Sequence, residues 1–125
     1  MTSILLNRRP VSGPWGGGNL LVSAICKNFK DNNIEIVHDF SSNVDVIFMQ
    51  DPRPGNTGIS INEIIKYKIS NPDVKIVHRV NECDARKGTE GFDELLRQCS
   101  RYTDHTVFVS KWMKDYHISN GWNCK

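Results

Sequence analysis

Short apolar runs alternate with longer amphipathic stretches along this chain of 125 residues. Short runs of apolar or alternating residues are typical of β-strands, and apolar residues that recur every three or four positions are typical of α-helices. The strand-like runs predict strands at residues 3–7, 34–38, 44–49, 74–79 and 106–109. The amphipathic stretches lie between these runs or after them, so the pattern predicts strands alternating with helices.

Four amphipathic stretches predict helices. Their apolar positions are Leu20, Leu21, Ala24, Ile25 and Phe29; Ile61, Ile64, Ile65 and Ile69; Phe92, Leu95, Leu96, Cys99 and Tyr102; and Trp112, Met113 and Tyr116. The first helix is expected to stop at residues 31–33. Ser60 and Glu63 have the spacing of a capping box, which predicts the start of the second, and Pro72 follows its end. Ser110 is expected to cap the last helix, which ends near Gly121.

This alternation predicts an α/β fold: a single Rossmann-like domain over residues 1–125, with a mostly parallel sheet and helices on both faces. The link between the strands at 34–38 and 44–49 does not fit this pattern. It is short, whereas a parallel crossover needs about a dozen residues or more. We therefore expect either that these two strands are antiparallel or that one of them is not a regular member of the sheet.

Composition limits the class of protein. The net charge of +2 is too small to indicate nucleic-acid binding by itself. The apolar run at residues 3–6 is too short for a signal peptide, and no stretch is long enough for a transmembrane helix. We therefore expect a cytoplasmic protein with reduced cysteines. Cys26 and Cys99 lie on apolar helix faces and are predicted to be core residues, while Cys83, in a polar segment, is a candidate for ligand contact.

The segment His78–Lys87 is the first candidate site, because it follows a buried strand and is densely polar. Ligands of open α/β sheets bind beyond the carboxyl ends of the strands. Asn81, Asp84 and Arg86 can bond sugar hydroxyls or phosphates, and His78 is a candidate catalytic residue that titrates near neutral pH. The alternative is a charged loop that is merely solvated.

The second candidate is the glycine-rich segment 13–19 between the first strand and the first helix. Gly16, Gly17, Gly18 and Asn19 would let the backbone approach a phosphate or sugar at a helix N-terminus, and the Trp15 indole could stack on a sugar ring or base. The dinucleotide fingerprint fails, because Leu21 stands where its third glycine belongs. A tight turn that needs positive φ is the alternative. We expect this loop and residues 78–87 to face one another across one cleft.

Three segments together resemble the N-terminal domain of group 1 glycosyltransferases, which have two Rossmann-like halves (the GT-B type). They are Gly-Pro-Trp-Gly-Gly-Gly-Asn after a strand, Lys75–Thr89 (KIVHRVNECDARKGT) and Tyr102–Tyr116 (YTDHTVFVSKWMKDY). The resemblance implies transfer of a sugar from a nucleotide-sugar donor to an acceptor. It also implies that the N-terminal half mainly binds the acceptor and that the C-terminal half holds most donor contacts.

The resemblance sets further expectations for the site and its partners. His78, Arg79, Arg86 and Lys87 could reach toward the cleft and stabilise the leaving diphosphate. Alternation along the strand means that His78 and Arg79 cannot both point the same way. Ser110, in the third segment, is a further substrate-binding candidate. The nucleotide-sugar is a substrate, so neither a cofactor nor a metal is expected. A donor-binding domain is absent from these residues, so the chain looks truncated and is expected to be inactive alone, with self-association through a surface near Trp112, Tyr116 and Trp122. A peripheral membrane contact stays open.

Three rival functions were weighed. A stand-alone flavodoxin-like or receiver-like module, binding a small ligand or a protein, is the main alternative, although Asn7-Arg8-Arg9 has the wrong charge for the Mg²⁺ site of a receiver. A zinc or hydrolytic enzyme would need the four histidines (His38, His78, His105 and His117), whose spacings match no helical metal pair. A nucleic-acid binder ranks last, because aromatic residues are scattered and charge is nearly balanced.

Overall fold

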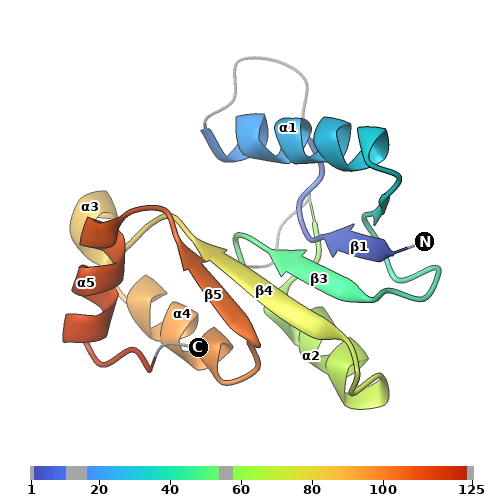
Figure 1. Cartoon of the computed structure of the whole chain (residues 1–125). Coiled ribbons are helices and arrows are strands. Elements are labelled where there is room, and N and C mark those ends of the chain that lie inside the picture. The colour runs from blue at the N-terminus through green and yellow to red at the C-terminus, as the bar shows by residue number, and fades with distance from the viewer. Residues whose placement is uncertain (1, 11–16, 54–57, 124–125) are drawn as a thin grey trace.

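The computed structural model describes residues 2–10, 17–53 and 58–123, with the backbone alone for residues 17–19. Its elements are β1 (Ser3–Leu6), α1 (Gly17–Asp31), β2 (Glu35–Val37), β3 (Val46–Met49), α2 (Ile61–Ser70), β4 (Lys75–Val80), α3 (Asp84–Lys87), α4 (Phe92–Ser100), β5 (His105–Phe108) and α5 (Lys111–Ser119). In the described residues the strands form one parallel sheet in the order β2-β1-β3-β4-β5 (Figure 1). The predicted α/β fold and its strand positions are confirmed.

The helices cover the two faces of the sheet unequally. α1 lies on one face beside β1, whereas α2, α4 and α5 lie on the other (Figure 1). Side chains alternate between the faces along each strand. Leu5, Ile47 and Ile76 are in register on adjacent strands and form the main core with Ile64 of α2. The face of β3 to β5 on the α1 side is only partly covered, and Val107 there is 41% exposed.

A second apolar cluster joins the carboxyl end of β4 to α4 and α5. Its buried members are Val80, Cys83, Leu96, Met113 and Trp122. The burial of Trp122, which is 4% exposed, corrects the expectation that this indole belongs to an exposed aromatic surface. It is buried because the chain turns back after α5, where the backbone N–H of Trp122 donates to the carbonyl of His117 at 3.0 Å. Trp112 remains 55% exposed and stacks on Tyr116 with ring centroids 5.4 Å apart.

Both expectations for the link between β2 and β3 are wrong. Each of these strands is parallel to β1 and pairs with it from opposite sides. Residues 38–45 suffice as a helix-free crossover because the strands are so short: the chain returns about 10 Å along a strand and crosses two spacings of about 5 Å. The link passes over the α2 side, where Phe40 stacks on Tyr67 at 4.3 Å and the Val44 N–H donates to the Tyr67 hydroxyl.

The helix ends follow the predicted signals, but several of the predicted apolar positions, including Leu20 at 67%, are exposed. Asn33, at φ 60°, ends α1 in the left-handed conformation that asparagine tolerates. The Ser60 N–H donates to the Glu63 carboxylate at 3.5 Å in the capping box of α2, and Ser110 Oγ accepts from the Met113 N–H at 3.1 Å in α5. Ile69 is 73% exposed, against expectation, because it lies in the last turn of α2 beyond the sheet. Tyr102 follows the end of α4 and is 43% exposed.

None of the helices formed by residues 17–53 and 58–123 is long and apolar enough to cross a lipid bilayer.

Candidate ligand site at the carboxyl edge of the sheet

The chain reverses its direction of travel across the sheet between β1 and β3. The connection after β1 leads outward to β2, and the connection after β3 leads the other way to β4. In open α/β sheets such a switch point opens a crevice beyond the carboxyl ends of the two strands, where ligands bind. Residues 7–8 follow β1 at this place, and residues 50–53 follow β3.

Asn7 ties these two segments together. Its side chain is buried, with 1% of the residue exposed. Oδ1 accepts from the Gln50 N–H at 2.8 Å, and Nδ2 donates to the carbonyls of Asp51 at 2.8 Å and Ile59 at 3.1 Å. Since a buried amide is costly unless it is paired, these bonds fix the segment after β3 against the end of β1.

Gly58 lets the chain pass close to the end of β1. The Ile59 N–H donates to the Asn7 carbonyl at 2.9 Å, and Gly58 forms an isolated antiparallel bridge with Arg8. A Cβ atom at position 58 would lie 1.7 Å from the Asn7 carbonyl oxygen. Only glycine fits this approach, so its presence explains how residues before α2 reach β1.

A compact ion network lies beside Asn7. Arg53 binds the Asp51 carboxylate through two nitrogens, both at 2.9 Å, and an Arg8 nitrogen lies 3.8 Å from the same carboxylate. Burial alone would raise the pKa of Asp51, but hydrogen bonds from Arg53 and the charges of Arg53 and Arg8 outweigh it and lower the pKa. Two guanidinium groups therefore share one carboxylate, and the network keeps a surplus positive charge.

Arg79 extends the site to the end of β4. Its Nη1 donates to the Gln50 side-chain oxygen at 3.3 Å. Gln50 and Arg79 are neighbours across β3 and β4 on the α1 side of the sheet, because Met49 is in register with His78. The site thus collects side chains from the ends of three adjacent strands.

Two cationic side chains lie against the ring of Phe92, which is at the start of α4. The Arg53 guanidinium carbon lies 4.7 Å from its ring centroid and the Lys87 ammonium 5.8 Å. These distances are within the range of cation–π attraction. The ring therefore links the loop after β3 to α3, which carries the predicted residues Arg86 and Lys87.

His78, the candidate catalytic residue, points the other way, into the core. It is fully buried, and neither ring nitrogen has a hydrogen-bond partner among the described residues. Burial lowers the pKa of His78 to about 4, and the charge of His117 acts in the same direction. The Gln50 backbone and the charge of Asp51 oppose this shift but do not outweigh it. The prediction that it titrates near neutral pH is therefore wrong, because alternation places Arg79 rather than His78 on the open face.

Unpaired polar atoms surround His78. Thr106 is in register with it on β5, and Trp122 lies 6.3 Å away between ring centroids. Thr106 Oγ1, Trp122 Nε1 and His117 Nδ1 likewise have no partner among the described residues, whereas His117 Nε2 lies 3.1 Å from the Glu82 carbonyl. The core beneath β4 and β5 is thus unusually polar.

Asp84 has a structural role. Its carboxylate accepts from the backbone N–H groups of Phe92 at 3.2 Å and Asp93 at 2.9 Å, and from the Thr89 hydroxyl at 2.6 Å. The hydrogen bond from Thr89, followed by those from the backbone, lowers the pKa of Asp84. Asp84 therefore holds the start of α4, and this use of its oxygens leaves fewer of them for the predicted sugar contact.

Of the other predicted residues, some are exposed at the carboxyl edge and others are buried or take part in helix capping. Asn81, Arg86 and Lys87 are exposed beside the carboxyl edge, and an Arg86 nitrogen lies 3.7 Å from the Glu82 carboxylate. Ser110 is also exposed, but its hydroxyl caps α5. Cys83 is fully buried in the second cluster, so its thiol cannot touch a ligand at this surface, contrary to expectation.

Residues 7–10, which precede the glycine-rich segment, leave the sheet at the same edge. Because β1 and β4 are parallel, the segments after both strands begin at the carboxyl edge, and α1 begins there at Gly17 (Figure 1). Trp15 and Gly16 lie outside the described residues, and for Gly17, Gly18 and Asn19 the backbone alone is described. That this loop faces residues 78–87 across a cleft stays a prediction.

Sequence reasoning considered Asn7 and Arg8 only against a Mg²⁺ site. It assigned no ligand-binding role to the residues that the structure places at the switch point: Asn7, Arg8, Gln50, Asp51 and Arg53. A signal for them existed, since they directly follow the first and third strands. The rule that singled out the end of the fourth strand applies equally to these two strand ends.

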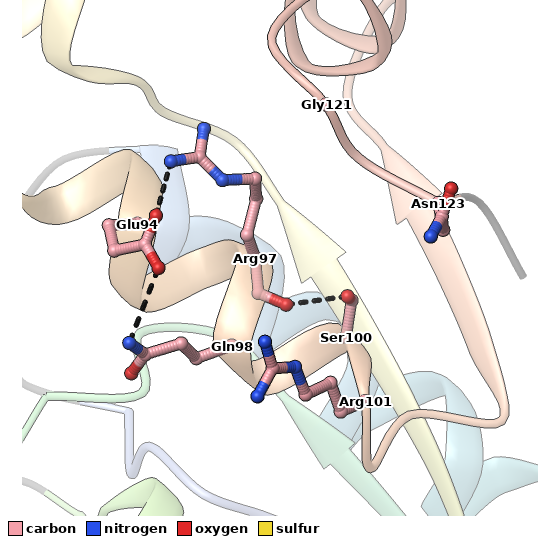
Figure 2. Close-up of a pocket in the computed structure, with 7 residues that line it drawn as sticks. All are labelled: Glu94, Arg97, Gln98, Ser100, Arg101, Gly121 and Asn123. Atoms are coloured by element: carbon pink, nitrogen blue, oxygen red, sulfur yellow. Dashed lines mark hydrogen bonds and ion pairs between the residues drawn. The ribbon is translucent and has the colours of Figure 1, made fainter.

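A shallow cavity of about 310 Å³ lies elsewhere, between α4 and the segment after α5 (Figure 2). Its lining residues are Glu94, Arg97, Gln98, Ser100, Arg101, Gly121 and Asn123. The Arg97 side chain is held by the Glu94 carboxylate and by the Asn120 carbonyl. The cavity contains none of the predicted site residues. Among residues 2–10, 17–53 and 58–123, no group of three or more His, Cys, Asp or Glu side chains could hold a metal ion.

Comparison of the chain with family models, with curated proteins and with solved structures found no match.

The close approach at Gly58 gives a first prediction. Gly58→Ala is expected to lower the free energy of unfolding by at least about 2 kcal/mol, because its Cβ forces the chain away from Asn7. Gly88→Ala is the matched comparison: Gly88 has φ 65° but no atom within 4 Å of its Cβ position, so only about 1 kcal/mol of backbone strain is expected. Urea unfolding measures both, and equal losses would contradict the proposed contact.

The burial of His78 gives a second prediction. Protonation is disfavoured in the fold, so the stability that comes from keeping His78 neutral is fully present above pH 6.5, the ordinary histidine value, and is lost as the pH falls to about 4. The loss should reach about 3 kcal/mol. Urea unfolding of the chain and of His78→Leu from pH 7.5 to 4.5 should show a weaker pH dependence for the variant, and equal slopes would contradict the assignment.

Proposed function

We propose that this chain binds a sugar at the carboxyl edge of its sheet and forms the acceptor side of a glycosyltransferase with two Rossmann-like halves. The observation that supports this most is the gathering of hydrogen-bond donors and positive charge at the switch point. Arg8, Arg53 and Arg79 reach it from three strand ends, with Asp51 as the carboxylate of the network. Guanidinium groups suit sugar hydroxyls and phosphate oxygens, which are both hydrogen-bond acceptors.

The requirements of sugar transfer support the proposal that this chain forms the acceptor side and that a second half binds the donor. In a sugar transfer, negative charge develops on the leaving diphosphate, and positive groups that are already in place stabilise it. The exposed cations Arg86 and Lys87 lie beside the edge, and α1 begins there. A single wall of a cleft leaves water in contact with the donor, which weakens this electrostatic help. We therefore expect the chain to need a second donor-binding half for transfer.

The alternative, a flavodoxin-like binding module, has one observation in its favour. The strand order β2-β1-β3-β4-β5 is the order of flavodoxin-like folds, which bind a flavin at the same switch point. The two functions place their ligands at one edge, so the identity of the ligand distinguishes them.

Ligand titrations of the ¹⁵N-labelled chain, followed by NMR, test the proposal. Methyl hexosides (gluco, manno and galacto) and flavin mononucleotide would be the probes. We expect at least one hexoside to shift the amides of Arg8, Asp51 and Arg79. The amides of Lys75 and His105, at the opposite ends of β4 and β5, serve as internal controls and should stay in place.

Flavin binding at the edge without any hexoside shift would replace the proposal by the alternative. Hexoside shifts confined to the opposite edge would contradict it as well. A coupled assay for UDP release from UDP-glucose completes the experiment. We expect no release by this chain alone, and turnover would show that these residues contain a complete catalytic site.

A further inference from the structure

Arg79 is a half-buried cation that has no carboxylate partner in the part of the chain that the structure describes. The Asp51 carboxylate binds Arg53, and Glu82 pairs with Arg86. Among the described residues, Arg79 makes no ion pair, and the Gln50 amide oxygen at 3.3 Å is its hydrogen-bond partner. The residues outside the described ranges contain no aspartate or glutamate, so none of their side chains could supply a carboxylate either.

Removing part of a charged group from water is unfavourable, and a bound anion would offset that cost. Burial lowers the pKa of Arg79, yet an arginine stays protonated at any pH at which proteins fold. A guanidinium group has five N–H donors, and hydrogen bonds to charged acceptors are about twice as strong as those to neutral ones. One neutral amide oxygen leaves most of this capacity unused.

The guanidinium group is also held in place. Gln50 is 8% exposed, and its backbone N–H is bound by Asn7 Oδ1 at 2.8 Å. Arg79 therefore donates to the side chain of a residue whose backbone is anchored by the buried amide of Asn7. A positioned donor loses less conformational entropy when it binds a ligand than a free surface side chain does.

Further cations lie at the same carboxyl edge of the sheet as Arg79. Arg8 and Arg53 share the Asp51 carboxylate, and Lys87 contacts the Phe92 ring without an ion pair to any described carboxylate. On its own face of the sheet, Arg79 is in register with Val107, an apolar neighbour. Charge interactions are stronger where apolar groups displace water.

We propose that Arg79 binds a phosphate or carboxylate group carried by the sugar at this edge, so that the acceptor is an anionic sugar. This inference rests on the proposed sugar-binding function for the identity of the ligand, and on the geometry of Arg79 for its charge. Arginine suits this task because its planar fork can bind two oxygens of a phosphate or carboxylate at once.

Calorimetric titration with glucose 6-phosphate, glucuronate, methyl glucoside and inorganic phosphate tests the inference. We expect both anionic sugars to bind at least about tenfold more tightly than methyl glucoside. Arg79→Gln should weaken the binding of the anionic sugars by about tenfold or more and weaken the binding of methyl glucoside much less. Arg79→Lys keeps the charge without the fork and should fall between.

Lys75→Gln is the matched control. It removes one positive charge from the same strand and the same face, at the opposite edge of the sheet. It should change the affinity of glucose 6-phosphate by less than about twofold, because an exposed charge several residues away is screened by salt. Equal losses for Lys75→Gln and Arg79→Gln would overturn the inference, and urea unfolding of both variants shows whether each still folds.

The other outcomes separate this inference from the proposed function. Equal affinities for methyl glucoside and glucose 6-phosphate would overturn the inference that the acceptor is anionic. The proposed sugar-binding function would still stand. If inorganic phosphate binds as tightly as glucose 6-phosphate and no hexoside shifts an amide in the NMR titration, the proposed sugar-binding function is overturned. Tighter, Arg79-dependent binding of UDP than of either anionic sugar would assign Arg79 to a nucleotide diphosphate and overturn the acceptor assignment.

Discussion

The hydrogen bonds of one buried amide organise the functional edge of this molecule. Asn7 directly follows the first strand, and its side chain binds the backbone on both sides of the loop that follows the third strand. Leaving any of these buried groups unpaired would cost about 1–3 kcal/mol, so they hold one another in a single arrangement. Gly58 allows the returning chain to close on the Asn7 carbonyl. The result is a rigid platform at the place where an open α/β sheet presents its ligand site.

Two arginines share one carboxylate on this platform. Asp51 serves Arg53 and Arg8 together, and its carbonyl accepts from Arg8 as well as from Asn7. A carboxylate held by two cations stays ionised, and it leaves the surrounding edge positive. Among the described residues, Arg79 donates only to the neutral amide oxygen of the Gln50 side chain. The chain as a whole is nearly balanced at +2, so the local excess arises from placement and not from composition.

The fourth strand shows how alternation separates structure from function. His78 and Arg79 are neighbours in sequence, yet one is fully buried beside Trp122 and the other reaches the open face beside Gln50. The same division holds after the strand, where Cys83 joins the core and Asp84 caps α4, while Asn81 and Arg86 stay exposed. A dense polar segment therefore serves the core, a helix start and the surface at the same time.

The sequence by itself determined the local elements and their class. Strand positions, the helix starts at Ser60 and Ser110, and the parallel α/β architecture follow from periodicity and capping, which depend on nearby residues. Only the tertiary structure decided which strands are neighbours, and so how residues 38–45 cross the sheet without a helix. It also decided that Asn7, Gln50 and Arg79 meet, that His78 lies inside, and that Trp122 is buried. These outcomes depend on contacts between residues far apart in the chain and on which face of a strand is covered, and neither is encoded in a local pattern.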